Sequence, residues 1–267
     1  MKRFAKWLLW GVLGLVLIGI LALGGPALYE VATGVTATEF TNRTFPAADG
    51  ATLHGYLAEP EGAGPYPAVL LIHEWWGLNE DITRIADALA VEGYVVLAAD
   101  AYRGETTNQV SRALYLTTNT PASQIESDLD SGLAYLRGLP NVDGARVATM
   151  GFCFGGRQSF GLGTRHGDLA AVVDYYGGGV EVESAADLGQ LNSPFLGIFG
   201  ETDSSIPLSD VEKLEAAVQE RGLPNEFTVY PGVGHAFLDS ENLADLNHPA
   251  GQAWQQTLQF LATYLQP

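Results

Sequence analysis

The chain has 267 residues, of which 47% are hydrophobic, and this is enough apolar material for one large α/β domain with a substantial core. Its formal net charge is −18, with only 13 lysines and arginines, which argues against nucleic acid as a partner. Cys153 is the only cysteine, so the chain can form neither an intrachain disulfide nor a cysteine-based zinc cluster. We expect a monomer without a metal or other cofactor.

An uncharged apolar run occupies residues 7–23, directly after a basic amino-terminal segment. Its length is near the lower end of the roughly 17–25 residues of a membrane-spanning helix, whereas the apolar part of a signal peptide has about 7–15 residues. This difference favours an uncleaved anchor over a cleaved signal, although Ala22-Leu23-Gly24 resembles a weak cleavage site. We therefore expect one membrane-spanning helix before the catalytic part of the chain.

The charges beside this run predict its orientation. Lys2, Arg3 and Lys6 would hold the amino terminus in the cytoplasm, which would place the rest of the chain on the extracytoplasmic side of the cytoplasmic membrane. Cleavage would instead give a secreted or periplasmic protein. The predicted boundaries are an anchor or signal-like helix at 1–25, a linker at 26–37 and one catalytic domain at 38–267.

The catalytic part begins with two β-prone runs, Thr38–Phe45 and Ala51–Ala58, joined across Asp49-Gly50, which is a hairpin signal. Apolar strand-like runs then alternate with helical patterns, and this alternation predicts a mostly parallel sheet flanked by helices. The expected strands are 68–72, 94–99, 146–150, 169–175, 194–199 and 226–230, and the expected helices are 79–92, 125–136, 208–220 and 253–265.

Residues 151–155, Gly-Phe-Cys-Phe-Gly, have the G-x-C-x-G pattern of a nucleophile elbow, with a thiol in place of the usual hydroxyl. A sharp strand-to-helix turn at this point would expose the side chain of Cys153. The amino terminus of the following helix would favour both a thiolate and an oxyanion. The alternative is a buried, inert cysteine. The flanking glycines and the partners downstream favour the nucleophile.

Two further side chains complete the pattern of a catalytic triad. Asp203 and His235 follow predicted strands, as Cys153 does, and the carboxyl ends of parallel strands meet at one edge of a sheet. The order nucleophile, acid, histidine is that of the α/β-hydrolases. Cys153 would attack a carbonyl, His235 would transfer the proton, and Asp203 would orient the imidazole. The backbone N–H groups of Phe154 and Trp75 would form the oxyanion hole.

Six short motifs together resemble one known family, the dienelactone hydrolases or carboxymethylenebutenolidases of the α/β-hydrolase superfamily. The resemblance runs from about residue 38 to the carboxyl terminus and implies an α/β-hydrolase fold. The motifs are G-F-C-F-G-G at 151–156, H-E-W-W-G at 73–77, D-A-Y-R-G at 100–104, Y-Y-G at 175–177, G-E-T-D at 200–203 and G-H-A-F at 234–237.

The resemblance implies a catalytic role for Glu74, because the matching glutamate of the family pairs with the cysteine and takes part in its activation when substrate arrives. A solvated loop carboxylate is the alternative. Four aromatic residues near the strand ends, Trp76, Tyr102, Tyr175 and Phe237, are candidates for the lining of a substrate pocket. Ordinary core packing is the alternative for some of them.

The chain departs from the family where the substrate carboxylate is bound. The family uses two arginines, and Arg103 lies near the first of these positions and is a candidate substrate-binding residue. The second position, just past the catalytic histidine, holds Asp239. A negative charge near a bound carboxylate would repel it. We therefore expect a preference for neutral esters or lactones over substrates that carry an acid.

These observations predict a thiol-dependent hydrolase that cleaves a small-molecule carboxylic ester or lactone through a thioester acyl-enzyme. Two alternatives stay open. One is a non-catalytic binding or scaffold protein on the same fold, because fold does not determine function. The other is an acyltransferase that uses the same triad with an acceptor other than water.

Overall fold

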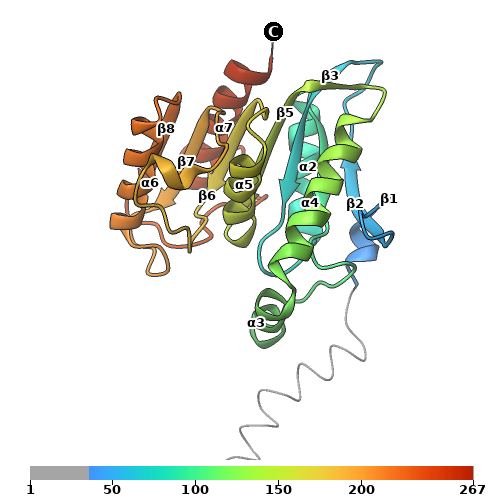
Figure 1. Cartoon of the computed structure of the whole chain (residues 1–267), viewed down its shortest axis with the longest axis horizontal. Coiled ribbons are helices and arrows are strands. Elements are labelled where there is room, and N and C mark those ends of the chain that lie inside the picture. Colours follow the sequence, from blue (N-terminus) through green and yellow to red (C-terminus); the bar gives the residue numbers. More distant parts are fainter. Residues whose placement is uncertain (1–35, 267) are drawn as a thin grey trace, which may run out of the picture.

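The computed structural model describes residues 36–266. In this part of the chain an eight-stranded sheet runs through the molecule in the order β1-β2-β4-β3-β5-β6-β7-β8, with helices against it (Figure 1). The strands are β1 (Arg43–Pro46), β2 (Thr52–Ala58), β3 (Tyr66–Ile72), β4 (Val95–Ala99), β5 (Val142–Phe152), β6 (Ala171–Tyr175), β7 (Phe195–Gly200) and β8 (Asn225–Tyr230).

Helices cover both faces of the sheet, with α4 and α5 in front of it and α2 and α7 behind it in the view of Figure 1. The layers therefore are helix, sheet, helix, as the alternating pattern predicts. The helices are α2 (Glu80–Val91), α3 (Val110–Asn119), α4 (Ala122–Arg137), α5 (Phe154–Arg165), α6 (Leu208–Glu220) and α7 (Pro249–Leu265), and the short 3-10 helices are η1 (Ala37–Phe40) and η2 (Ala185–Leu188).

From β4 to β8 all neighbouring strands of the sheet are parallel. Strands β4, β6 and β7 are buried along their whole length, because helices exclude water from both faces of the sheet. This double burial explains why the strands read in the sequence as continuous apolar runs rather than as alternating patterns. The predicted α/β-hydrolase type of fold, with a mostly parallel sheet, is confirmed.

The amino-terminal hairpin is present, but its first strand is shorter than predicted. β1 and β2 pair antiparallel, and the turn between them contains Gly50 at φ 85°. The segment Ala37–Phe40 forms a 3-10 helix instead of a strand. Ala37 is fully buried and donates its N–H to the carbonyl of Gly104 at 3.0 Å, which fixes the chain before β1 begins. The end of the predicted linker is therefore packed against the domain.

The sequence did not predict helix α3, because this helix has almost no apolar stripe. Only Ala113 and Leu116 are buried in it, whereas Val110, Leu114 and Tyr115 are more than half exposed. Threonines near its end further weaken the helical pattern, since β-branched residues have a low helix propensity. α3 follows the loop after β4 and, as shown below, contributes Thr117 to the candidate active site.

None of the helices within residues 36–266 combines the length and the apolar character that crossing a membrane requires. The predicted anchor at 1–25 and all but the last two residues of the predicted linker lie outside the described residues. Within the described part, the carboxyl ends of the parallel strands bring together the loops that follow β3, β5, β7 and β8. These four loops carry the candidate catalytic residues.

Candidate active site

Cys153 lies in a sharp turn between the end of β5 and the start of α5. Its backbone has φ 54° and ψ −114°, a conformation that residues with a side chain rarely adopt. The turn is held by close packing, because a Cβ atom at Gly155 would collide with the backbone carbonyls of Ile72 and His73. A Cβ at Gly151 would collide with the backbone of Gly155. The strand-to-helix elbow is therefore pressed directly against the end of β3.

His235 and Asp203 form a hydrogen-bonded pair beside this elbow. Nδ1 of His235 lies 2.6 Å from Oδ2 of Asp203, whose side chain is almost completely buried. The other carboxylate oxygen of Asp203 accepts the N–H of Ser205 at 2.7 Å. Because Asp203 occupies Nδ1, the other ring nitrogen, Nε2, is left to exchange a proton with a reacting group.

A cavity of about 470 Å³ connects the elbow with this pair. Its wall is mainly apolar and aromatic, with a few polar groups between the rings, as in typical small-molecule sites. The lining residues are Glu74, Trp75, Trp76, Thr117, Cys153, Phe154, Arg157, Gly178, Ser205, Ile206, His235 and Ala236.

The surroundings of Cys153 favour the protonated thiol over the thiolate. Burial, together with the negative charges of Glu74 and Asp203, raises the pKa of Cys153 to about 12. Hydrogen bonding by the backbone N–H groups of Phe154 and Trp75 acts in the opposite direction. These two N–H groups therefore face the position of the sulfur, where they also could bind an oxyanion. In the resting site, the cysteine is a protonated thiol at neutral pH.

Glu74 is placed to influence this thiol, because it lines the same cavity. Burial, reinforced by the negative charge of Asp81, raises the pKa of Glu74 to about 7. The carboxyl group therefore changes its charge near neutral pH. Since the negative charge of Glu74 raises the pKa of Cys153, a change in the protonation of Glu74 changes the pKa of the thiol.

The loop that carries Glu74 and Trp75 is anchored by the buried His73. The ring Nε2 of His73 accepts the N–H of Ala101 at 3.0 Å, so the proton is on Nδ1, which donates to the carbonyl of Glu74 at 2.6 Å. Complete burial lowers the pKa of His73 to about 4, so the ring is neutral. A neutral imidazole thus ties the loop after β3 to the loop after β4.

The comparisons with known proteins agree with this geometry. The family model described as "Dienelactone hydrolase family" matches residues 53–265. The chain belongs to the dienelactone hydrolase family.

Relatives of known sequence and structure support this assignment. The chain is 32% identical over 226 residues to a "Putative carboxymethylenebutenolidase" of Synechocystis sp., covering 79% of this chain and 92% of the relative. It is 31% identical over 228 residues to a protein of the same name from Escherichia coli, covering 80% and 84% of the two chains. The crystal structure of a "Putative Dienelactone Hydrolase" from Klebsiella pneumoniae superposes with a TM-score of 0.70 at 30% identity, covering 84% of this chain and 100% of that one. The prediction of an ester or lactone hydrolase of this family is confirmed.

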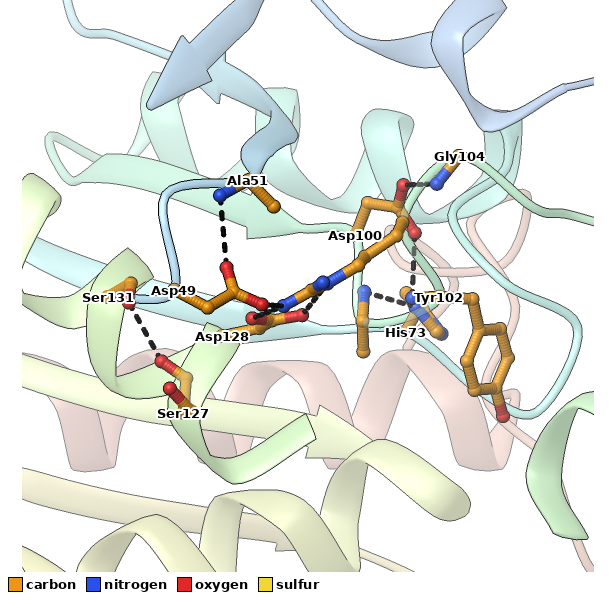
Figure 2. A network of polar contacts seen from close by, with 11 residues as sticks. Asp49, Ala51, His73, Asp100, Tyr102, Gly104, Ser127, Asp128 and Ser131 are labelled. Carbon is orange, nitrogen blue, oxygen red and sulfur yellow. Dashed lines mark hydrogen bonds and ion pairs between the residues drawn. The ribbon is translucent and has the colours of Figure 1, made fainter. Parts of the chain in front are cut away.

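Arg103, which the sequence suggested as a substrate-binding residue, does not line the cavity. Its guanidinium donates to both carboxylate oxygens of Asp128, at 2.7 and 2.8 Å, and to Asp49 at 2.9 Å. Asp49 lies in the turn between β1 and β2 and Asp128 lies on α4, and Figure 2 shows these two carboxylates side by side. Both acids pair with the guanidinium in the structure. Arg103 therefore links the loop after β4 to the amino-terminal hairpin and to α4, and it does not face the cavity.

The predicted aromatic substrate residues fall into two groups. Trp76 lines the cavity, and Tyr102 lies directly behind it, with its ring 5.3 Å from that of Phe154 and its hydroxyl 3.1 Å from Thr117. Tyr175 is fully buried in the core and donates its hydroxyl to the carbonyl of Ala253 at 3.0 Å. The structure therefore places Tyr175 between sheet and α7, away from the cavity.

Phe237 and Tyr176 form an aromatic support behind His235. The ring of Tyr176 lies 5.2 Å from the imidazole of His235 and 5.6 Å from the ring of Phe237. Tyr176 is fully buried and has a positive φ of 41°, which directs it out of the end of β6. Neither ring lines the cavity, and their packing limits the positions that the imidazole can take. The site residues that sequence reasoning missed include His73 and Arg157.

The charge balance around the thiol can be tested by removing the charge of Glu74. A negative charge disfavours the thiolate, so Glu74→Gln is expected to lower the pKa of Cys153. A decrease of one pKa unit would make alkylation by iodoacetamide about tenfold faster at a pH well below the thiol pKa. The pH dependence of the alkylation rate measures this shift. Glu80→Gln, which neutralises an exposed carboxylate on α2, is the control. Slower or unchanged alkylation in Glu74→Gln would contradict the assignment.

Proposed function

We propose that the protein hydrolyses carboxylic esters or lactones through Cys153, His235 and Asp203, with a thioester acyl-enzyme as intermediate. One observation carries the proposal. Cys153 and His235 line one cavity, Asp203 is hydrogen-bonded to His235, and the N–H groups of Phe154 and Trp75 face the sulfur of Cys153. These are the four functions that acyl transfer needs, namely nucleophile, base, orienting acid and oxyanion donors.

Acylation begins from the protonated thiol. As Sγ of Cys153 attacks the carbonyl carbon, Nε2 of His235 accepts the thiol proton and Asp203 stabilises the imidazolium. The carbonyl oxygen becomes an oxyanion, which accepts hydrogen bonds from the N–H groups of Phe154 and Trp75. The tetrahedral intermediate collapses with cleavage of the C–O bond. His235 returns its proton to the departing alkoxide, and a thioester remains on Cys153.

Deacylation follows the same route with water as nucleophile. His235 removes a proton from water as its oxygen attacks the thioester carbonyl, and the oxyanion forms again in the same hole. Collapse of this second intermediate breaks the C–S bond and releases the carboxylic acid. The proton on His235 returns to the sulfur, which restores the resting thiol.

We propose that Glu74 keeps the resting nucleophile inactive until substrate binds. Its negative charge raises the pKa of the thiol, so little thiolate is present for side reactions with oxidants or alkylating agents. A substrate that excludes water from the cavity would raise the pKa of Glu74 further and favour its protonated form. The loss of that charge would help Cys153 to give up its proton during the attack.

Kinetics of single and double variants test the triad. Cys153→Ala, His235→Ala and Asp203→Ala are each expected to lower kcat for an activated ester by a factor on the order of a thousand or more. Because the three residues act as a unit, the double variants should be little slower than the slowest single variant. Retained secondary structure by circular dichroism and an unchanged elution volume in size-exclusion chromatography would show that the variants fold.

The chain offers a matched control for these variants. His166 also pairs with a carboxylate, Asp130 at 3.0 Å, but this second pair lies outside the catalytic cavity. His166→Ala should therefore leave kcat within about twofold of the native value. Near-normal turnover in Cys153→Ala would overturn the mechanism. If an ester labels Cys153 with one acyl group per protein molecule and no turnover follows, the result would instead favour a binding protein.

We further propose that residues 7–23 anchor the catalytic domain on the extracytoplasmic side of the cytoplasmic membrane, because this uncharged run follows three basic residues. The full chain should then sediment with membranes and resist extraction by high salt, whereas a chain that begins at Gly34 should be soluble and retain kcat. Mature protein that begins after Leu23 and is free outside the cell would show that the segment is a cleaved signal.

A further inference from the structure

Among the residues that line the catalytic cavity, Arg157 is the one arginine or lysine. Arg157 is on α5, and its backbone N–H donates to the carbonyl of Cys153 at 3.2 Å, so it lies one helical turn beyond the nucleophile. This hydrogen bond fixes the backbone of Arg157 relative to the nucleophile. A guanidinium at this place can reach one part of a substrate while Cys153 reacts with another part.

Arg157 is also the one lysine or arginine within residues 36–266 whose side chain makes no hydrogen bond or ion pair with the protein. Arg221 donates to backbone carbonyls, and each of the remaining basic side chains of this range has a carboxylate partner. These ion pairs are Arg43–Glu59, Arg84–Glu80, Arg103–Asp128, Arg112–Glu105, Arg137–Asp168, Arg146–Asp143, Arg165–Asp130 and Lys213–Glu183.

An unpaired arginine is unexpected in a chain with 31 acidic and 13 basic residues. Acids are available nearby, because Glu126, Glu181 and Asp187 line a groove that adjoins the catalytic cavity and also includes Arg157. Asp187 is already used by the N–H groups of Glu183 and Ser184. None of these acids pairs with Arg157, so its guanidinium keeps its donors free at the cavity.

The guanidinium of Arg157 lies against the backbone of Gly179. A Cβ atom at Gly179 would lie 3.0 Å from Nη1 of Arg157, so the guanidinium rests on a part of the chain without side chains. The neighbouring Gly178 lines the catalytic cavity. The fork of donors is therefore accessible from the cavity, where a planar anion could bind in bidentate fashion.

We propose that Arg157 is the anion-binding residue of the active site, and that the preferred substrates are esters or lactones that carry a carboxylate one helical turn away from the scissile carbonyl. This inference rests on the proposed hydrolase function and specifies its substrate class. It replaces the preference for neutral substrates that Arg103 and Asp239 suggested in the sequence.

The positions of those two residues explain the change. Asp239 accepts hydrogen bonds from the N–H groups of Glu241 and Asn242 and does not line the cavity, so its charge stabilises a loop. Arg103 is held by Asp128 and Asp49. Glu74 is the one acid among the residues that line the cavity. Glu74 lies near the sulfur of Cys153. A substrate carboxylate bound to Arg157 would lie one turn further along α5, away from Glu74.

A matched pair of substrates tests the proposal in the full-length protein. The pair is the mono-para-nitrophenyl ester of glutaric acid and the para-nitrophenyl methyl diester of the same acid, in which a methyl group removes the negative charge. The native protein should hydrolyse the acid with about tenfold higher kcat/KM, since a hydrogen bond to a charged group contributes about 1.5–3 kcal/mol and 1.4 kcal/mol is tenfold. Arg157→Gln should remove this preference, mainly through KM, and leave the diester within about twofold.

Two variants serve as controls. Arg157→Lys keeps the charge without the fork and should retain part of the preference. Arg43→Gln removes the same charge from the edge strand β1, where Arg43 pairs with Glu59, and should keep the full preference. An unchanged preference in Arg157→Gln, or an equal loss for both substrates, would overturn the proposal. The half-esters of succinic and adipic acid then define the spacing that the site accepts.

A binding measurement separates this proposal from the proposed function. Cys153→Ala and the double variant Cys153→Ala/Arg157→Gln are titrated with the anion of glutaric acid monoamide and with neutral glutaramide. The single variant should bind the anion about tenfold more tightly than the double variant and the neutral amide equally. Equal binding of the anion by both variants would overturn the anion site. Failure of the native protein to hydrolyse either ester would overturn only the hydrolase function.

Discussion

The contact between the nucleophile elbow and the end of β3 is the constraint on which the site depends. Gly155 lies so close to the carbonyls of Ile72 and His73 that no side chain fits between them. This packing forces the chain through the left-handed conformation at Cys153 and starts α5 at the next residue. It also sets the loop after β3 beside the elbow. The positions of the candidate nucleophile, of the candidate oxyanion donors and of Glu74 thus depend on one backbone contact, between the start of α5 and the end of β3.

The polar groups around this contact have different tasks because their surroundings differ. His73 is buried and neutral, and it fixes the loop that carries Glu74 and Trp75 to the loop after β4. Glu74 is near the sulfur and has a pKa near neutrality, so its charge can respond to a bound substrate. His235 is oriented by the buried Asp203 and supported by Tyr176. In the proposed mechanism these groups act through electrostatic preorganisation in a cavity with mainly apolar walls.

The sequence predicted the parallel sheet and the positions of Cys153, Asp203 and His235, because all of these depend on local patterns. A buried strand, a glycine and a reactive residue are adjacent in the chain. The sequence did not reveal which way a side chain turns once it has left a strand end. Arg103 and Tyr175 follow buried strands, yet one pairs with Asp128 and the other bonds to Ala253. The importance of Arg157 depends on the absence of a partner, which only the packed structure shows.

The most direct test of the account is the mass of the protein during turnover. The native chain is mixed with excess para-nitrophenyl ester, quenched in acid within the first turnovers, and analysed by intact mass and peptide mapping. The account predicts the addition of one acyl group, located on the peptide that contains Cys153 and absent in Cys153→Ala. Continued hydrolysis without acylation of Cys153, or acylation of a different residue in step with turnover, would contradict it.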